Sequence, residues 1–540
     1  MPKNSQSFSY NVLNAFLIFL CLTSFHFPTS NAEVSKNYSS TLNQDTSFDA
    51  TQFIEEIINT LINEAQYENE SLLGWIHEFN SKHQPDKLFY SGYQVGVAGI
   101  GDFLIDAYTA GFDNLTSILD DTITYFQTNF KIDSDEGIYW PRFTTLPSDG
   151  WLGNRYGISG ITKYLAHLQS ENYTSNLYNL INNAFTWLLN QREADGSLPI
   201  NPGSHITTGQ EYGAAGIGSS LFQVGNYMQN GSYIIFAEEV ANWLTSVGIW
   251  EGDKLKIPWT PVGEETEFDN FCATGYGLGS AGFIEFYLDL YDYTRNDTYL
   301  DIALALSNYL LSTDQGGYWN DGSLPYITTL YGGNDGLIGY KVGASGIVQQ
   351  LLRLSTYINN EKLIESSARS ELFIEEYVHS NGSISVGRDY PQLHRTGLGV
   401  GAAGIANYYL ELYEKFGLPR HLESSEKILA HLYETYNKYN LIPINEANLD
   451  WGYSFNIDTG LAGIGKVLLK YLDVIENQDK PRTMIESIFV YENVYSTSIP
   501  STQIPITSKS TEDNSPILMF NQIGFLITGI VVLQLLRNKK

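Results

Sequence analysis

The stretch Gly92-Tyr-Gln-Val-Gly96-Val-Ala-Gly99-Ile100 decides the fold, because variants of it recur along the whole chain. Each copy, called a cassette below, has a glycine four residues before a central glycine, which is followed by any one residue, Ala or Ser, a third glycine, and Ile or Phe. The central glycines lie 56 to 66 residues apart, a period that indicates a repeat architecture. The other cassettes are Gly153 to Ile161, Gly209 to Ile217, Gly275 to Phe283, Gly339 to Ile347, Gly397 to Ile405, and Asn456 to Ile464, in which Asn replaces the first glycine.

The cassettes predict a ring of helices. Apolar residues at helical spacing follow each cassette, as in Gly101 to Tyr108, and a second helical run such as Ile118 to Phe130 comes next. Connections rich in Gly, Pro and Asp, such as Asp135 to Pro141, Asp195 to Pro199 and Asp321 to Pro325, predict short hairpins or extended arms. The first and last cassettes are as apolar as the others, so polar capping repeats are not expected. We therefore predict an all-α fold, a closed α/α toroid of seven helical hairpins, rather than an open solenoid.

The cassette glycines suggest crowding where the inner helices begin. Glycine allows close approach of backbones, and we expect positive φ angles at these helix starts. Seven helix N-termini at one level would direct their dipoles at a central cavity. That cavity would favour anions unless side chains neutralise it.

The two ends of the chain predict a membrane-anchored ectodomain. The N-terminus has Lys3, an apolar stretch and a small-x-small site, which is typical of a signal peptide, with an uncleaved anchor as the alternative. A C-terminal apolar segment is long enough to cross a bilayer and is followed by basic residues, which favours a single-pass type I protein with the ring outside the cell. The predicted parts are a signal peptide at 1–32, a disordered polar segment at 33–46, the toroid at 47–478, a Ser/Thr/Pro-rich stalk at 495–516, a transmembrane helix at 517–536 and a cytoplasmic tail at 537–540.

Composition narrows the possible partners. The chain carries 30 basic and 60 acidic residues, a net charge of −30, so we expect no binding to nucleic acid. Cys21 lies in the signal peptide, which leaves Cys272 as the single cysteine of the mature chain and excludes an internal disulfide. Asn-x-Ser/Thr sequons permit a glycoprotein.

The cassettes resemble those of the lanthionine synthetase C family, over about 430 residues of this chain. The resemblance implies an α/α toroid with seven such motifs. It also implies cyclisation, in which a zinc-bound cysteine thiolate of a substrate peptide adds to a dehydrated Ser or Thr. In the family, two cysteines and one histidine close to the central glycines of late cassettes hold the zinc, and another histidine near an earlier cassette transfers a proton.

This chain departs from the family at those positions. One mature cysteine cannot form a zinc site of two cysteines and a histidine, so we expect no zinc and no other cofactor. Cys272 and His394, each seven residues before a central glycine, are too few for a metal site. The pairs found two and one residues before the central glycines are Gln94-Val95, Arg155-Tyr156, Glu211-Tyr212, Gly277-Leu278, Lys341-Val342, Gly399-Val400 and Asp458-Thr459.

These positions supply the candidate site residues. If the ring places them as in the family, they face the central cavity, where unpaired charges are costly. The leading interpretation is binding of a peptide or small ligand, with Arg155, Tyr156 and Lys341 as ligand-binding candidates.

An enzyme is the second interpretation. Glu211 and Asp458 could act as the carboxylate pair of a zinc-independent glycoside hydrolase of the six-hairpin type. Tyr212 is a third catalytic candidate, because Tyr156 or Tyr212 occupies the type of position that holds the family's proton-transfer histidine. A tyrosine pKa of about 10 makes it a poorer base. A set of salt bridges at a solvated mouth, and a non-catalytic scaffold, remain the alternatives.

Overall fold

The computed structural model describes most of the repeat domain, within a compact unit of residues 1–498. The predicted signal peptide, polar segment, transmembrane helix and tail lie outside the described residues, as does nearly all of the stalk. Within the described part, no helix has both the length and the apolar character that a bilayer span requires. The described residues are 48–68, 70–76, 89–133, 137–143, 150–174, 176–261, 271–320, 336–388, 390–449, 452–477, 491–492 and 494–495.

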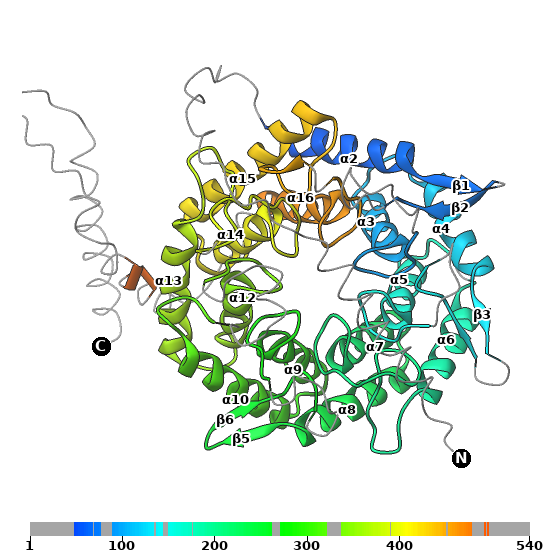
Figure 1. The fold of residues 1–540 in the computed structure, drawn as a ribbon, viewed down its shortest axis with the longest axis horizontal. Helices are drawn as coiled ribbons and strands as arrows, with labels where there is room; N and C mark the ends of the chain where they lie inside the picture. The colour runs from blue at the N-terminus through cyan, green and yellow to red at the C-terminus, as the bar shows by residue number, and fades with distance from the viewer. Residues whose placement is uncertain are drawn as a thin grey trace, which may run out of the picture. The chain divides into compact units, whose positions relative to one another are not determined.

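Each cassette starts a helix, and these helices form an inner ring (Figure 1). Consecutive inner helices are in contact, and the last, α16, contacts the first, α3, so the ring is closed. The closed toroid predicted from the cassettes is therefore the observed arrangement of the described helices. The inner helices are α3 (Val97–Thr109), α5 (Ile158–Ser170), α7 (Ala214–Met228), α9 (Ser280–Thr294), α12 (Ala344–Leu354), α14 (Ala402–Phe416) and α16 (Leu461–Glu476).

An outer helix packs against each inner helix, but the seventh comes from an unexpected place. Helix α2 precedes the first cassette and packs against α16, where two helices per unit had predicted a helix after α16. Helix α2 thus completes the last unit (Figure 1). The outer helices are α4 (Thr116–Thr128), α6 (Tyr178–Asn190), α8 (Gly231–Ser246), α10 (Asp297–Thr313), α13 (Glu361–Glu375), α15 (Pro419–Tyr439) and α2 (Ala50–Glu64).

The cassette glycines are required by close approach and not by positive φ. Gly96 has φ −147° and Gly157 has φ −108°, which any residue can adopt, so the expectation of positive φ at the helix starts is wrong. A Cβ atom on Gly96 would lie 2.4 Å from the carbonyl oxygen of Tyr90. A Cβ atom on Gly92 would lie 2.4 Å from the carbonyl oxygen of Arg155 in the next cassette.

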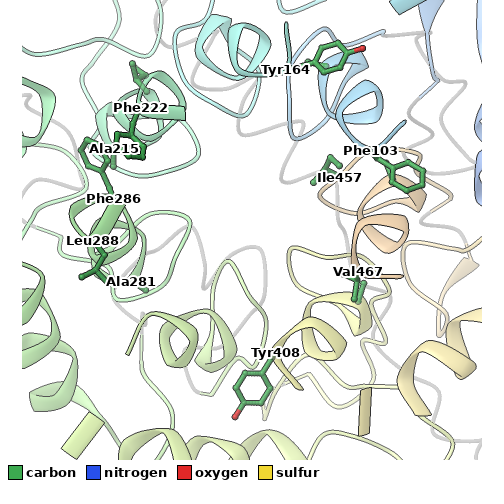
Figure 2. Packing of buried hydrophobic residues seen from close by; sticks show 14 of the residues in the cluster. Phe103, Tyr164, Ala215, Phe222, Ala281, Phe286, Leu288, Tyr408, Ile457 and Val467 are labelled. Atoms are coloured by element: carbon green, nitrogen blue, oxygen red, sulfur yellow. The ribbon is translucent and has the colours of Figure 1, made fainter. Parts of the chain in front are cut away.

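Aromatic residues of one inner helix fill gaps left by glycines of its neighbour. The ring of Phe286 in α9 lies over Gly218 of α7, where a Cβ atom would approach it to 2.5 Å. Phe103 of α3 packs in the same way over Gly465 of α16, across the closure of the ring. Figure 2 shows Phe103 and Phe286 among the buried residues between the inner helices. This packing fixes the spacing of neighbouring helices.

Three short antiparallel hairpins lie outside the ring of described helices (Figure 1). They pair β1 (Gln66–Glu68) with β2 (Ser71–Gly74), β3 (Lys131–Ile132) with β4 (Ile138–Tyr139), and β5 (Ile249–Glu251) with β6 (Lys254–Lys256). Strand β4 lies in the predicted arm 135–141. Pro199, at the end of another predicted arm, pairs with Ile206 in an isolated bridge, and the arm 321–325 lies outside the described residues.

Residues beyond the predicted end of the toroid at 478 also pack against it. The Tyr491 side chain is fully buried, with its ring centroid 4.1 Å from that of Phe416, and its hydroxyl donates to Glu371 in α13. The Tyr495 hydroxyl donates to Glu375 at 2.9 Å. This segment therefore attaches to the outer side of α13 and the end of α14.

Replacing Gly92 by Ala should destabilise the ring by about 1–3 kcal/mol, because the added methyl group would meet backbone atoms of the next cassette that cannot rotate away. Urea unfolding followed by circular dichroism would measure this loss. Gly231→Ala is the matched control, since a Cβ atom there meets nothing within 4 Å and Ala favours the helix. Equal effects of the two substitutions would contradict the close-approach argument.

Replacing Phe53 by Ala should cost about 3–5 kcal/mol, because this fully buried side chain of α2 holds the seventh outer position against Tyr433 and Tyr436. The exposed Glu55→Ala in the same helix should change stability by less than about 0.5 kcal/mol. Urea unfolding of both variants tests whether α2 is an integral part of the ring. A Phe53→Ala variant as stable as Glu55→Ala would show that α2 is dispensable.

Candidate functional site

The seven cassettes are joined by a closed circle of backbone hydrogen bonds. In each cassette the residue two before the central glycine donates its N–H to the carbonyl oxygen of the matching residue in the next cassette, and the seventh donates back to the first. The donor–acceptor distances lie between 2.8 and 3.2 Å. The residues of this circle are, in order, Gln94, Arg155, Glu211, Gly277, Lys341, Gly399 and Asp458.

Because the backbone closes in this way, the side chains of the same residues meet. The Lys341 Nζ lies 2.7 Å from Glu211 Oε1, 2.9 Å from Asp458 Oδ2 and 2.7 Å from Gln94 Oε1. The Arg155 Nη1 lies 2.7 Å from Asp458 Oδ2 and 3.4 Å from Glu211 Oε2. These five residues form one axial cluster. The four charges predicted to converge do so, and they neutralise one another.

The two glycines of the circle leave the space that the carboxylates occupy. A Cβ atom on Gly399 would lie 2.0 Å from Asp458 Oδ1, and one on Gly277 would lie 3.1 Å from Glu211 Oε1. The side chains of Arg155, Lys341 and Asp458 are 16%, 10% and 6% exposed, so the cluster is largely shielded from water. Charges this buried interact strongly.

The cluster controls the ionisation of Asp458. Burial alone would raise the pKa of this carboxyl, but the positive charges of Lys341 and Arg155 outweigh it and hold the pKa well below its usual range. Asp458 is therefore an anion at neutral pH. Such a group can orient a cation but is unsuited to donate a proton as a general acid.

The helix N-termini do not form an anion site in this ring. In each inner helix the first two N–H groups donate to the backbone carbonyls of the segment before the cassette, as Val97 donates to Tyr90 at 3.0 Å and Ala98 to Ser91 at 3.2 Å. The expected preference for anions on the axis is therefore not supported, because these donors are satisfied and the axial charges balance.

Beside the axial cluster lies an aromatic face. It consists of half-buried rings from the first three cassettes and their approaches: Tyr90, Phe143, Trp151, Tyr156 and Tyr212. The centroids of Tyr156 and Tyr212 are 5.9 Å apart, and Trp151 lies 5.3 Å from Tyr156. Burial alone would raise the Tyr156 pKa, but the charges of Arg155 and Arg142 outweigh it and lower the pKa.

A second polar layer, which the cassette analysis missed, lies deeper along the inner helices. Asp102 of α3 accepts from the Tyr93 hydroxyl at 2.6 Å, from Lys466 of α16 at 2.6 Å, and lies 2.8 Å from His167 Nδ1 of α5. The sequence carried a signal for this layer, because the residues six and ten after each central glycine are polar in every unit. They are Asp102 and Asp106, Lys163 and His167, Ser219 and Gln223, Glu285 and Asp289, Gln349 and Arg353, Asn407 and Glu411, and Lys466 and Lys470.

Two members of this deeper layer have perturbed ionisation. Burial lowers the pKa of Lys163, whose Nζ lies 4.0 Å from the Tyr93 ring centroid, against the attraction of Asp102. Burial and the charge of Asp289 raise the pKa of Glu285 to about 7. Other members pair between neighbouring helices, as Arg353 does with Asp289 at 2.7 Å. These pairs link the inner helices to one another.

The donors present do not fit the family's zinc. The residues two before the central glycines supply an amide, a guanidinium, two carboxylates and an ammonium group. The Lys341 ammonium lies among the oxygens of Gln94, Glu211 and Asp458. Cys272 is half-buried, and burial raises the pKa of its thiol to about 11. Among the described residues no group of three or more His, Cys, Asp or Glu side chains is arranged to hold a metal. His394 instead stacks on His379.

Comparison with known proteins identifies the family. Residues 150–485, more than half of the chain, match the family described as lanthionine synthetase C-like protein. The chain belongs to this family. No curated protein sequence matches this lanthionine synthetase C-like chain.

Solved structures resemble this lanthionine synthetase C-like protein in fold. Nisin cyclase is similar over 83% of this chain and 98% of its own, with 13% identity and a TM-score of 0.49. Cellobiose 2-epimerase from Bacillus thermoamylovorans B4167 is similar over 78% and 98%, with 12% identity and a TM-score of 0.45. A glycoside hydrolase family 76 (mannosidase) from Bacteroides thetaiotaomicron is similar over 71% and 100%, with 14% identity and a TM-score of 0.41.

Replacing Asp458 by Asn should destabilise the protein by roughly 3–5 kcal/mol at pH 7, because two buried cations would then share one carboxylate. The folded-state pKa of Asp458 is lowered, so its stabilising contribution is present above pH about 4 and is lost as the pH falls below that value. Urea unfolding at several pH values should show the difference between wild type and variant shrinking toward acid.

Adding Lys341→Met to Asp458→Asn restores the balance of charge and supplies the control. The double variant should be more stable than the sum of the two single losses predicts, by about 1–3 kcal/mol. Additive losses, or a pH-independent effect of Asp458→Asn, would show that the axial cluster does not act as a unit.

Proposed function

We propose that this protein is a membrane-anchored, extracellular member of its family that binds a peptide or small ligand at the cassette end of its ring without the family's zinc site. The observation that carries the proposal is the axial cluster. Side chains from five cassettes meet there and form a charge-balanced network, from the column of the repeat in which the resemblance to the family implies metal ligands in late cassettes.

Burying four charged side chains costs desolvation free energy, which supports a role for the axial cluster beyond packing. Buried ion pairs are often replaceable by apolar residues without loss of stability, so the presence of their charged partners in four of the seven cassettes favours use in recognition. The half-buried aromatic face next to the cluster offers the apolar contact area that a ligand site requires. Arg155 belongs to the cluster and also lies with its Cζ 5.3 Å from the Tyr156 ring, so it connects the two parts.

The geometry favours binding over carboxylate catalysis. A glycoside hydrolase needs one carboxyl group that holds a proton and a second that is free to act on the substrate. Asp458 is kept ionised, and both Asp458 and Glu211 are engaged by Lys341 and Arg155. Releasing either carboxylate would leave a buried cation short of a partner. Tyr212, the third catalytic candidate, lies on the aromatic face with its ring beside Trp151 and Tyr156.

The placement outside the cell rests on the two termini. The predicted signal peptide and transmembrane helix carry it. Protease added to intact cells that express the full chain, tagged near residue 40 and at the C-terminus, should remove the first tag and spare the second. Loss of neither tag would reject the extracellular placement.

A thermal-shift experiment on the full-length protein in detergent tests the binding function. A panel of short peptides and amino acids should contain members that raise the unfolding midpoint by about 2 °C at ten times their Kd, because they bind only the folded ring. Trp151→Ala should abolish the shift, whereas Trp250→Ala, on the exposed β5 hairpin, should retain it.

Elemental analysis of the same preparation should find zinc well below one atom per chain. Stoichiometric zinc would overturn the claim that the family's site is absent. If no panel member shifts the midpoint, or if Trp151→Ala leaves every shift intact, the scaffold alternative replaces binding.

A further inference from the structure

The aromatic face holds an arginine that the proposed function has not yet used. Arg142 lies between β4 and the second cassette, and its carbonyl oxygen accepts from the N–H of Ser91 at 3.3 Å, beside the first cassette. Its guanidinium carbon lies 4.0 Å from the Tyr156 ring centroid and 4.7 Å from those of Trp151 and Phe143. Aromatic rings therefore surround this cation.

No carboxylate of the described residues forms an ion pair with Arg142, unlike Arg155, which makes two. Its Nε is buried and has no hydrogen-bond partner, while the side chain as a whole is only half-buried. A buried Nε without a hydrogen-bond partner is not confined to Arg142, since Arg155 has one too, but Arg155 is paired with two carboxylates. Among the residues that the structure describes, this positive charge has no carboxylate partner.

The groups around Arg142 indicate which kind of ligand would pair with its positive charge. A guanidinium presents a planar fork of donors that matches the two oxygens of a carboxylate. The flanking rings of Trp151 and Tyr156 supply apolar area on which the body of a ligand can lie. The axial cluster next to this position is already neutral and does not compete for the anion.

We propose that Arg142 binds the carboxylate of the ligand while Trp151 and Tyr156 contact its apolar part. This inference rests on the proposed ligand-binding function and deepens it, because it specifies a carboxylate-bearing ligand such as a peptide with a free C-terminus. The lowered pKa of Tyr156 agrees with a positive potential at this position, to which Arg155 contributes most and Arg142 next.

The test compares two probes that differ only in charge. N-acetyl-L-phenylalanine carries a carboxylate, and N-acetyl-L-phenylalaninamide is its neutral analogue. Isothermal titration calorimetry on the full-length protein should show the acid binding at least tenfold more tightly than the amide. Arg142→Gln should reduce this ratio to below threefold, and Arg142→Lys should retain part of it. The unfolding midpoint of each variant reports whether it is folded.

Arg388→Gln is the matched control. Arg388 also lies over aromatic rings, 4.6 Å from the Tyr318 centroid, but it belongs to a different part of the ring and donates to the Tyr318 hydroxyl. This variant should leave the preference for the acid unchanged.

Several results would overturn the inference. They are equal affinity for acid and amide, a preference that survives Arg142→Gln, or binding of neither probe. Inorganic phosphate that displaces the acid at lower concentration than acetate does would assign the position to phosphate esters instead of carboxylates. The proposed function fails separately, because peptide-induced shifts that depend on Trp151 would persist if only the anion preference were wrong.

Discussion

The closed circle of backbone hydrogen bonds between the cassettes is the constraint on which the rest of the structure depends. Each cassette must approach the next closely enough for one N–H to reach one carbonyl oxygen, and Gly92 shows what that requires, since even a methyl group would collide with the next backbone. Asn456 can replace the first glycine in the seventh cassette, where its own side chain caps the turn by accepting from the N–H of Thr459 at 2.8 Å. Because the circle closes, the residues two before each central glycine all lie around the axis of the ring, where their side chains meet. The backbone geometry thus determines which side chains meet on the axis of the ring.

Much of this arrangement could be predicted from the sequence because the cassette is a local signal that is repeated. Its period predicted inner helices, and the apolar character of the first and last copies predicted closure. The seventh outer helix could not be assigned in this way, because α2 carries no cassette and its partner α16 lies at the other end of the domain. The close approach expected at the glycines is confirmed, but the accompanying expectation of positive φ was wrong. Crowding around a residue does not depend on its φ angle. Gly96 therefore has an extended backbone that any residue could adopt, yet a Cβ atom there would collide with neighbouring backbone.

The candidate site was predicted in part for the same reason. Arg155, Glu211, Lys341 and Asp458 share one column of the repeat, so a ring had to bring them together, and the structure does so. Which of these charges pair depends on side-chain rotamers and on the space left by Gly277 and Gly399. Neither can be read from the column of residues alone. Arg142 belongs to no column, because it lies in a connection whose length varies from unit to unit. Residues supplied by such connections are where members of one toroid family can differ in ligand while keeping the same ring.

The packing of α2 against α15 and α16, at the other end of the domain, has a consequence for biogenesis. Thr60 of α2 and Tyr436 of α15 are 376 residues apart in sequence, yet their hydroxyls lie 2.6 Å apart. At translation rates of about 5–20 residues per second, roughly 20–75 s pass between the synthesis of the two partners. During that interval the residues of α15 and α16 that cover the apolar side of α2, including Phe53, in the folded ring have not yet been made. The nascent chain therefore exposes an apolar helix face until the last units of the ring have been made.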